Sequence, residues 1–237
     1  MHTSAKLEVN PVRLLKLLLG TGFVLAVVSL FVQLVFYQGP EFRGINSLVE
    51  FTNVDGENSV PSWYSSTQLF VCSGVLFAIA GLERRASRPH ARSWWGLAVI
   101  FLLLAIDETV QFHELVSDIL EETFNLSGFF YFTWVIPAAV FVLVLAAVYL
   151  RFFLGLPART RYLMFAAAGL FLSGALGVES VTARYVEANG FANLTYAALS
   201  TGEEFLEMVG ASLFLYALVA FLNRSVQALT LEFGSSN

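Results

Sequence analysis

Long apolar stretches separated by short polar segments run along the whole chain. A helix needs about 20 predominantly apolar residues to cross a hydrocarbon layer about 30 Å thick. Three stretches reach this length, a fourth starts with polar residues, and two more meet acidic residues near one end. The pattern predicts an all-α fold, a polytopic bundle of six transmembrane helices at about residues 12–37, 63–82, 94–120, 129–154, 162–181 and 199–222.

The composition fits one membrane domain and argues against an ordinary soluble protein. Hydrophobic residues make up 57 % of the chain and charged residues 13 %, and the mean hydropathy is +0.71. A soluble domain averages about 25 % charged residues. The net charge of −5 provides no basic surface for nucleic acid, so the lipid bilayer is the expected partner. We expect a single transmembrane domain over residues 1–224, with an external loop at 38–62 and a cytoplasmic tail at 225–237.

The basic residues are distributed unequally between the two ends of the predicted helices. Of the 13 Lys and Arg residues, only Arg43 and Arg184 fall on one side, and all the others fall on the opposite side. Cytoplasmic loops carry an excess of Lys and Arg. We therefore expect both termini in the cytoplasm, on the side of Lys6, Arg13, Lys16, Arg84, Arg85, Arg88, Arg92, Arg151, Arg159, Arg161 and Arg224.

Three predicted helices bring acidic residues to one layer of the membrane. At a rise of about 1.5 Å per residue, Asp107 lies about 20 Å from the cytoplasmic end of its helix, Glu179 about 27 Å and Glu207 about 25 Å. An ionisable side chain costs at least about 2.5 kcal/mol at mid-depth in the bilayer. We therefore expect these carboxyl groups to turn inward.

The spacing within the helices supports this arrangement. Acidic and amide residues recur every three or four positions in the helix at 94–120, which predicts a single stripe of Asp107, Gln111, Glu114, Asp118 and Glu121. Small residues recur every fourth position in the helix at 162–181, which predicts that another helix approaches closely along Gly169, Ser173 and Gly177.

The same layer contains His113, and an imidazole among carboxylates indicates a metal site. Zn, Fe or Mn suits this mixture of ligands. A ferritin-like di-iron site needs a Glu-x-x-His motif on each of two helices, and the sequence does not contain them. A mononuclear or carboxylate-rich site remains, with the candidate ligands His113, Glu114, Glu207, Glu204, Glu179, Glu108 and Asp107.

Two other functions stay open, and the sequence does not decide whether the protein is an enzyme. Acidic residues in membrane helices also relay protons, so a proton- or cation-coupled transporter is the first alternative. The second is a non-catalytic subunit of a larger membrane complex. The candidate protein partners are accordingly a second copy of the chain, in a homo-oligomer, or other subunits of such a complex. If the protein has a substrate, the polar start of the helix at 63–82 offers Trp63, Tyr64 and Ser66 as contacts.

Four segments carry a resemblance to known proteins. They are residues 61–66 (PSWYSS), 107–114 (DETVQFHE), 174–179 (GALGVE) and 203–208 (EEFLEM). Together they resemble an uncharacterised family of bacterial six-helix inner-membrane proteins, which implies a bacterial inner-membrane location and no known activity. A weaker analogy is to alkaline-ceramidase-like membrane hydrolases, which have seven helices and three His around zinc. One membrane His does not allow that zinc site to be carried over.

The orientation leads to a first prediction. A cysteine introduced in the loop at 38–62 should react with a membrane-impermeant thiol reagent in intact cells, because that loop is expected outside. Labelling that appears only after the membrane is opened would reverse the orientation and move the acidic layer to the cytoplasmic side.

Overall fold

The computed structural model describes residues 10–40, 42–56, 58–124 and 126–234, with side chains up to residue 226. Within these residues every regular element is helical. Six helical segments are long and apolar enough to cross a membrane, so the predicted multi-pass helical architecture is confirmed. They are α1 (Pro11–Gln38), α3 (Val60–Arg85), α4 (Ala91–Val110), α6 (Val135–Gly155), the run of α7 (Ala158–Leu172), η2 (Ser173–Val178) and α8 (Glu179–Asn189), and α9 (Leu194–Gly234).

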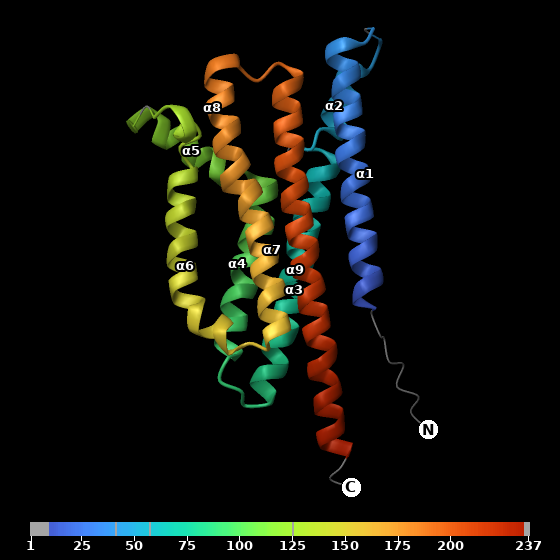
Figure 1. Cartoon of the computed structure of the whole chain (residues 1–237), viewed down its shortest axis with the longest axis vertical. Helices are drawn as coiled ribbons and strands as arrows, with labels where there is room; N and C mark the ends of the chain where they lie inside the picture. The colour runs from blue at the N-terminus through green and yellow to red at the C-terminus, as the bar shows by residue number, and fades with distance from the viewer. Residues whose placement is uncertain (1–9, 41, 57, 125, 235–237) are drawn as a thin grey trace.

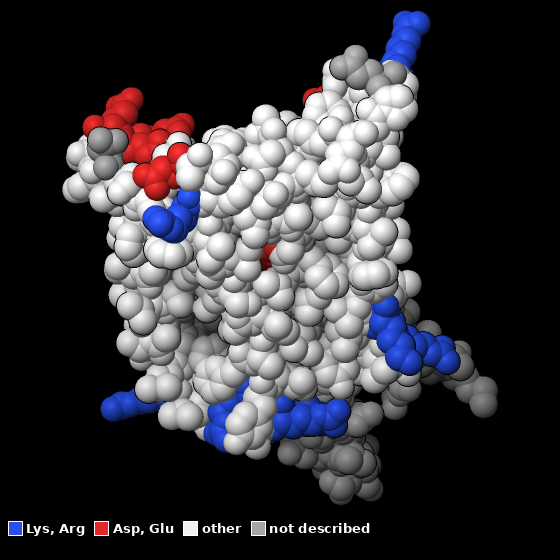
Figure 2. Space-filling model, turned by 45° about the horizontal axis from the view of Figure 1, so that its top comes forward, with Lys and Arg blue, Asp and Glu red and all other residues white. Residues whose placement is uncertain are grey.

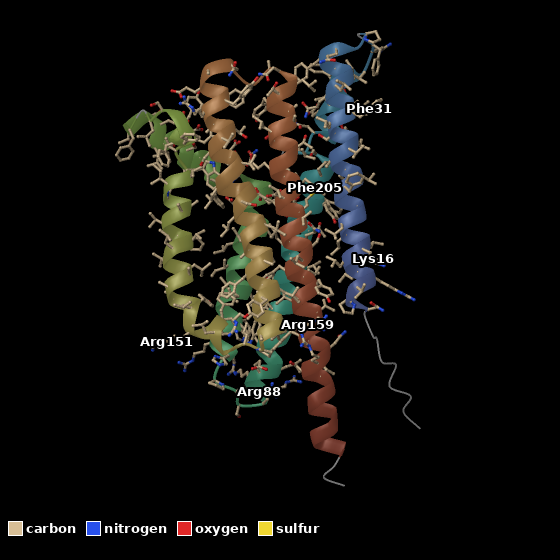
Figure 3. All side chains as sticks on the ribbon, in the orientation of Figure 1. Lys16, Phe31, Arg88, Arg151, Arg159 and Phe205 are labelled. Carbon is tan, nitrogen blue, oxygen red and sulfur yellow. The ribbon has the colours of Figure 1, made fainter. Side chains whose placement is uncertain are left out.

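The long helices run along one common direction, and the start of α1 and the end of α9 lie at the same end of the bundle (Figure 1). Helix α9 packs against α1, α3 and α7, and α3 packs along α4. Figure 3 shows Lys16, Arg88, Arg151 and Arg159 towards the end where the termini lie. Figure 2 shows acidic side chains gathered at the other end, with a mostly uncharged belt between the two. The side of the membrane on which the termini lie stays a prediction, and Lys6 lies outside the described residues.

The largest packed core lies in the half of the bundle near the Arg-bearing end. Its centre is Trp94, which is fully buried and stacks edge-on against Phe152 of α6 at 4.9 Å between ring centroids. Leu76 of α3 and Leu218 of α9 are also fully buried in this cluster. In contrast, Phe23 and Phe31 of α1 are more than half exposed, as expected for side chains that face lipid.

Helix α6 is attached mainly at its two ends. Val135 is buried at its start, and Phe152 and Leu156 join the packed core at its end. Between these points Leu143 is 70 % exposed and Val148 69 % exposed. The middle of α6 therefore faces its surroundings on one side and a cavity, described below, on the other.

The predicted helix at 94–120 is divided in two, which corrects the single acidic stripe expected on it. Gln111 adopts a left-handed conformation with φ of 63°, and α4 ends just before it. Helix α5 (Phe112–Phe124) then continues in a different direction (Figure 1). A left-handed residue ends a helix because its backbone no longer follows the helical path. The loop at 38–62 also contains a short helix, α2 (Ile45–Thr52), and a 3-10 turn, η1 (Gly128–Phe130), precedes α6.

Glycine does allow a close helix crossing, but at other positions than those predicted. A Cβ at Gly174 would lie 2.7 Å from the Glu203 carbonyl oxygen of α9, and a Cβ at Gly210 would lie 2.7 Å from the Phe171 backbone nitrogen of α7. Around Gly169 and Gly177 nothing lies within 4 Å of such a Cβ. Gly169 lies in α7, where Ala167 and Phe171 contact Gly210 instead. Gly177 lies in the π-helical turn η2, which widens the helix between residues 173 and 178 and shifts its face.

This crossing generates a second prediction. Gly210→Ala should lower the melting temperature, because its Cβ meets backbone atoms that cannot move aside, at a cost on the order of 1–3 kcal/mol. Gly169→Ala is the matched control, since it brings the same gain in helix propensity without a contact. Equal melting temperatures of the two variants in detergent would contradict this crossing.

Candidate functional site

A cavity of about 790 Å³ lies between α4, α6, α7 and α9. One end is acidic and the other apolar. The acidic end is lined by His113 and by ten carboxyl residues, namely Asp55, Asp107, Glu108, Glu114, Asp118, Glu121, Glu179, Glu203, Glu204 and Glu207. The lining formed by the described residues contains no Lys or Arg. All seven candidate metal ligands therefore border one space, although they come from four separate helical elements.

Asp107, near the end of α4, connects the two helices on either side of the break by contacting His113 of α5. One oxygen of this carboxylate accepts a hydrogen bond from the His113 backbone N–H at 3.1 Å, and the other lies 3.0 Å from Nδ1 of the His113 ring. Burial lowers the pKa of His113, but the hydrogen bond and charge of Asp107, with the charges of Glu114 and Glu108, outweigh it. The net effect raises the pKa of His113 above its usual value.

A chain of contacts continues from His113 across the cavity wall. The rings of His113 and Trp134 lie 5.1 Å apart between centroids. Trp134 donates a hydrogen bond from its indole N–H to Oε1 of Glu179 at 2.9 Å. Glu179, at the end of the π-helical turn, interacts through its carboxyl group with Glu203 of α9. Two neighbouring carboxyl groups disfavour ionisation of both, because like charges repel.

Helix α9 supplies three glutamates to the cavity within two turns. Glu203 and Glu207 are four residues apart, and Glu204 lies between them on an overlapping face. Gly174 meets α9 beside Glu203 and Glu207. The close crossing therefore fixes the position of the α9 carboxyl groups relative to α7 and η2.

Sequence reasoning missed Asp55 and Tyr196. Asp55 follows α2 in the loop, and it accepts a hydrogen bond from the Tyr196 hydroxyl of α9 at 2.7 Å. The protein around Asp55 raises its pKa by excluding water, the Tyr196 hydrogen bond opposes this effect, and the charge of Glu114 adds to it. The two residues are 141 positions apart, so no local pattern signals their contact.

Aromatic side chains also border the acidic end. Tyr131, Phe132, Trp134, Phe191 and Tyr196 all line the cavity. Phe132 stacks on Phe191 with 6.1 Å between ring centroids, and Phe191 meets Tyr196 nearly at a right angle at 5.2 Å. The acidic end is thus lined by both carboxyl groups and aromatic rings.

The three substrate-contact candidates lie elsewhere. Trp63 is 75 % exposed. The Tyr64 hydroxyl donates to the carbonyl of Leu18, and the Ser66 hydroxyl donates to that of Ala105, both at 2.7 Å. The described lining of the cavity includes none of the three candidates. The hydrogen bonds of Tyr64 and Ser66 hold α3 against α1 and α4, respectively.

The candidate metal ligands do not form a ready metal site. Among the described residues, no three His, Cys, Asp or Glu side chains are arranged so that they could hold a metal ion. They are spread around the cavity, and Asp107 and His113 contact one another. This arrangement can attract positive charge and hold protons without movement, whereas chelating a metal ion requires side chains to move.

Comparison with known proteins adds a family and no activity. The family described as a domain of unknown function (DUF8692) matches residues 17–222, which is most of the chain. No curated protein and no solved structure matches the chain.

The Asp107–His113 pair generates a third prediction. Because the pKa of His113 is raised in the folded protein, the pair stabilises the fold fully below about pH 6.5. Its contribution is lost as the pH rises through the raised value. The difference in melting temperature between the wild type and His113→Gln should therefore be largest in acid and shrink as the pH rises.

Asp107→Asn is the partner variant for this measurement. This variant lacks the carboxylate that pairs with the His113 imidazolium. It should therefore lose the same pH-dependent part of the folding stability as His113→Gln. A difference from the wild type that stays constant across the titration would show that the pair has no electrostatic role.

Proposed function

Since the chain belongs to the family described as a domain of unknown function (DUF8692), which assigns it no activity, we propose its function from the site itself. This multi-pass membrane protein binds a cation at the acidic end of its cavity. One observation carries the proposal: ten carboxyl groups line the cavity, and the described lining contains no Lys or Arg to balance them.

Asp55, Glu114, Asp118 and Glu121 are exposed, whereas Glu203 is buried and Glu179, Glu204 and Glu207 are partly buried. The carboxyl groups that are removed from bulk water need compensation, because an unpaired buried charge costs several kcal/mol. Protonation is one means, and it relieves the repulsion between neighbouring carboxyl groups such as Glu179 and Glu203. A bound cation is the other means. A cation that enters the cavity replaces protons on the carboxyl groups, so binding is expected to strengthen as the pH rises.

The rest of the cavity favours binding over conduction of ions. Towards the Arg-bearing end, its lining consists of side chains such as Leu97, Phe153 and Met164, which offer a cation no polar ligand. We therefore expect the cation to enter and leave through the acidic end. The resemblance and the distribution of basic residues support a periplasmic position for this end, in a bacterial inner membrane.

A divalent metal ion is one form of the proposed cation. His113 and Glu114 lie on the same wall, and imidazole with carboxylates suits Zn, Fe or Mn. In this form Glu204, Glu207 and the other acidic candidates complete the shell after a side-chain rearrangement.

A fourth prediction tests cation binding directly. Thermal unfolding is measured in detergent with Na⁺, Mn²⁺, Zn²⁺ or tetramethylammonium at constant ionic strength. A ligand that binds only the folded protein at 100 times its Kd adds about 2.7 kcal/mol of stability. We expect at least one of these cations to raise the melting temperature of the wild type.

The double variant Glu204→Gln/Glu207→Gln should lose most of this increase, because it removes two carboxylates from the cavity wall. Glu122→Gln is the matched control, because it removes an exposed carboxylate of α5 that is not part of the cavity lining. If no cation separates the double variant from the control, the cavity is not a cation site.

A further inference from the structure

We propose that the cation is the head group of an amphiphile: an alkylated ammonium whose single long chain lies in the apolar end of the cavity. This inference rests on the proposed cation binding and adds the class of ligand. Three features carry it, namely the aromatic rings at the acidic end, the apolar length of the cavity, and its exposed walls.

The aromatic rings favour an organic ammonium over a bare metal ion. Trp134 and Tyr196 line the cavity and donate hydrogen bonds to Glu179 and Asp55, so each of these two rings lies next to a carboxyl group. An alkylated ammonium is attracted to ring faces within about 6 Å, and aromatic cages are the usual recognition of quaternary ammonium groups. A small hydrated metal ion has no use for such rings and needs converging oxygen or nitrogen ligands instead.

The apolar end has the length of a lipid chain. The cavity follows α4 from Glu108 to Leu97, which are eleven residues or about 16 Å apart along the helix. This length is about half of the 30 Å hydrocarbon layer, the depth of one leaflet. Phe101, Leu145, Phe171 and Met164 form its sides. The total volume of about 790 Å³ is within the range of sites for single small ligands, about 300–1,000 Å³.

The walls show how such a molecule enters. Phe141 and Leu150 of α6 and Phe165 of α7 line the cavity, and they are 50 %, 51 % and 43 % exposed. Because α6 is attached mainly at its ends, its middle leaves the apolar end accessible from the side. A chain already in the bilayer slides in laterally, while its charged head reaches the carboxyl groups at the acidic end.

The fifth prediction compares tetramethylammonium with dodecyltrimethylammonium. The protein is placed in bilayer discs of digalactosyldiacylglycerol, a lipid whose head group carries neither an amine nor a charge. The shift in melting temperature is titrated with each probe, with dodecanol as the uncharged chain. We expect the long-chain ammonium to bind at least about tenfold more tightly than tetramethylammonium, because buried CH₂ groups add affinity. Dodecanol should bind more weakly than the long-chain ammonium.

Two tryptophan variants of α6 test where the chain lies. Ala146 lines the cavity, so Ala146→Trp should fill the apolar end and remove the advantage of the long chain, while tetramethylammonium still binds. Ala147 is exposed and is not part of the lining, so Ala147→Trp is the matched control. Loss of the advantage in Ala146→Trp alone supports the proposal.

Failure of this inference is distinct from failure of cation binding. If both ammonium probes bind with equal affinity to the wild type, the cavity holds a cation but not an amphiphile. If dodecanol binds as tightly as dodecyltrimethylammonium, and Glu204→Gln/Glu207→Gln changes neither, the cavity holds a chain and the proposed cation site is wrong as well.

Discussion

The bundle has to keep the carboxyl groups of its membrane helices away from lipid, and its assembly follows from this constraint. Each ionisable side chain at mid-depth costs at least about 2.5 kcal/mol if it faces hydrocarbon. Helix α9 carries Glu203, Glu204 and Glu207, and it packs against α1, α3 and α7. Attraction between apolar surfaces does not drive helices together in lipid, so close packing has to do so. Gly174 and Gly210 permit that packing beside the glutamates.

The two halves of the bundle differ in packing: one half is a dense core and the other half encloses the cavity. Around Trp94 the helices meet in a dense apolar core, and Phe152 attaches the end of α6 to it. At the other half the same helices enclose a cavity instead. Filling that cavity with apolar side chains would add packing contacts but would leave the acidic residues without water or a ligand. The packed half therefore holds the helices in place while the acidic half stays open.

The sequence predicts the helices much better than it predicts the site. Six apolar stretches and the inward acidic residues follow from hydropathy and from the cost of charge in lipid. The break at Gln111 does not, because the acidic spacing continues through it and a left-handed residue is set by the Asp107–His113 contact. Gly174 and not Gly177 meets α9, because both lie in the π-helical turn, which changes which face meets α9. Asp55 meets Tyr196 only through the tertiary fold.

The spread of the carboxyl groups distinguishes the kinds of cation that fit the cavity. A zinc site needs about four ligands within about 2.0–2.3 Å of one point, whereas no three described side chains of the suitable types converge in this way. A bulky ammonium carries its charge at the centre of several alkyl groups, so it gains from carboxylates on several walls at longer range and from the faces of Trp134 and Tyr196. Its apolar substituents can also contact the apolar lining beyond the acidic end without losing hydrogen bonds. A compact ion gains nothing from the apolar end, whereas a ligand with a chain would use the whole length of the cavity.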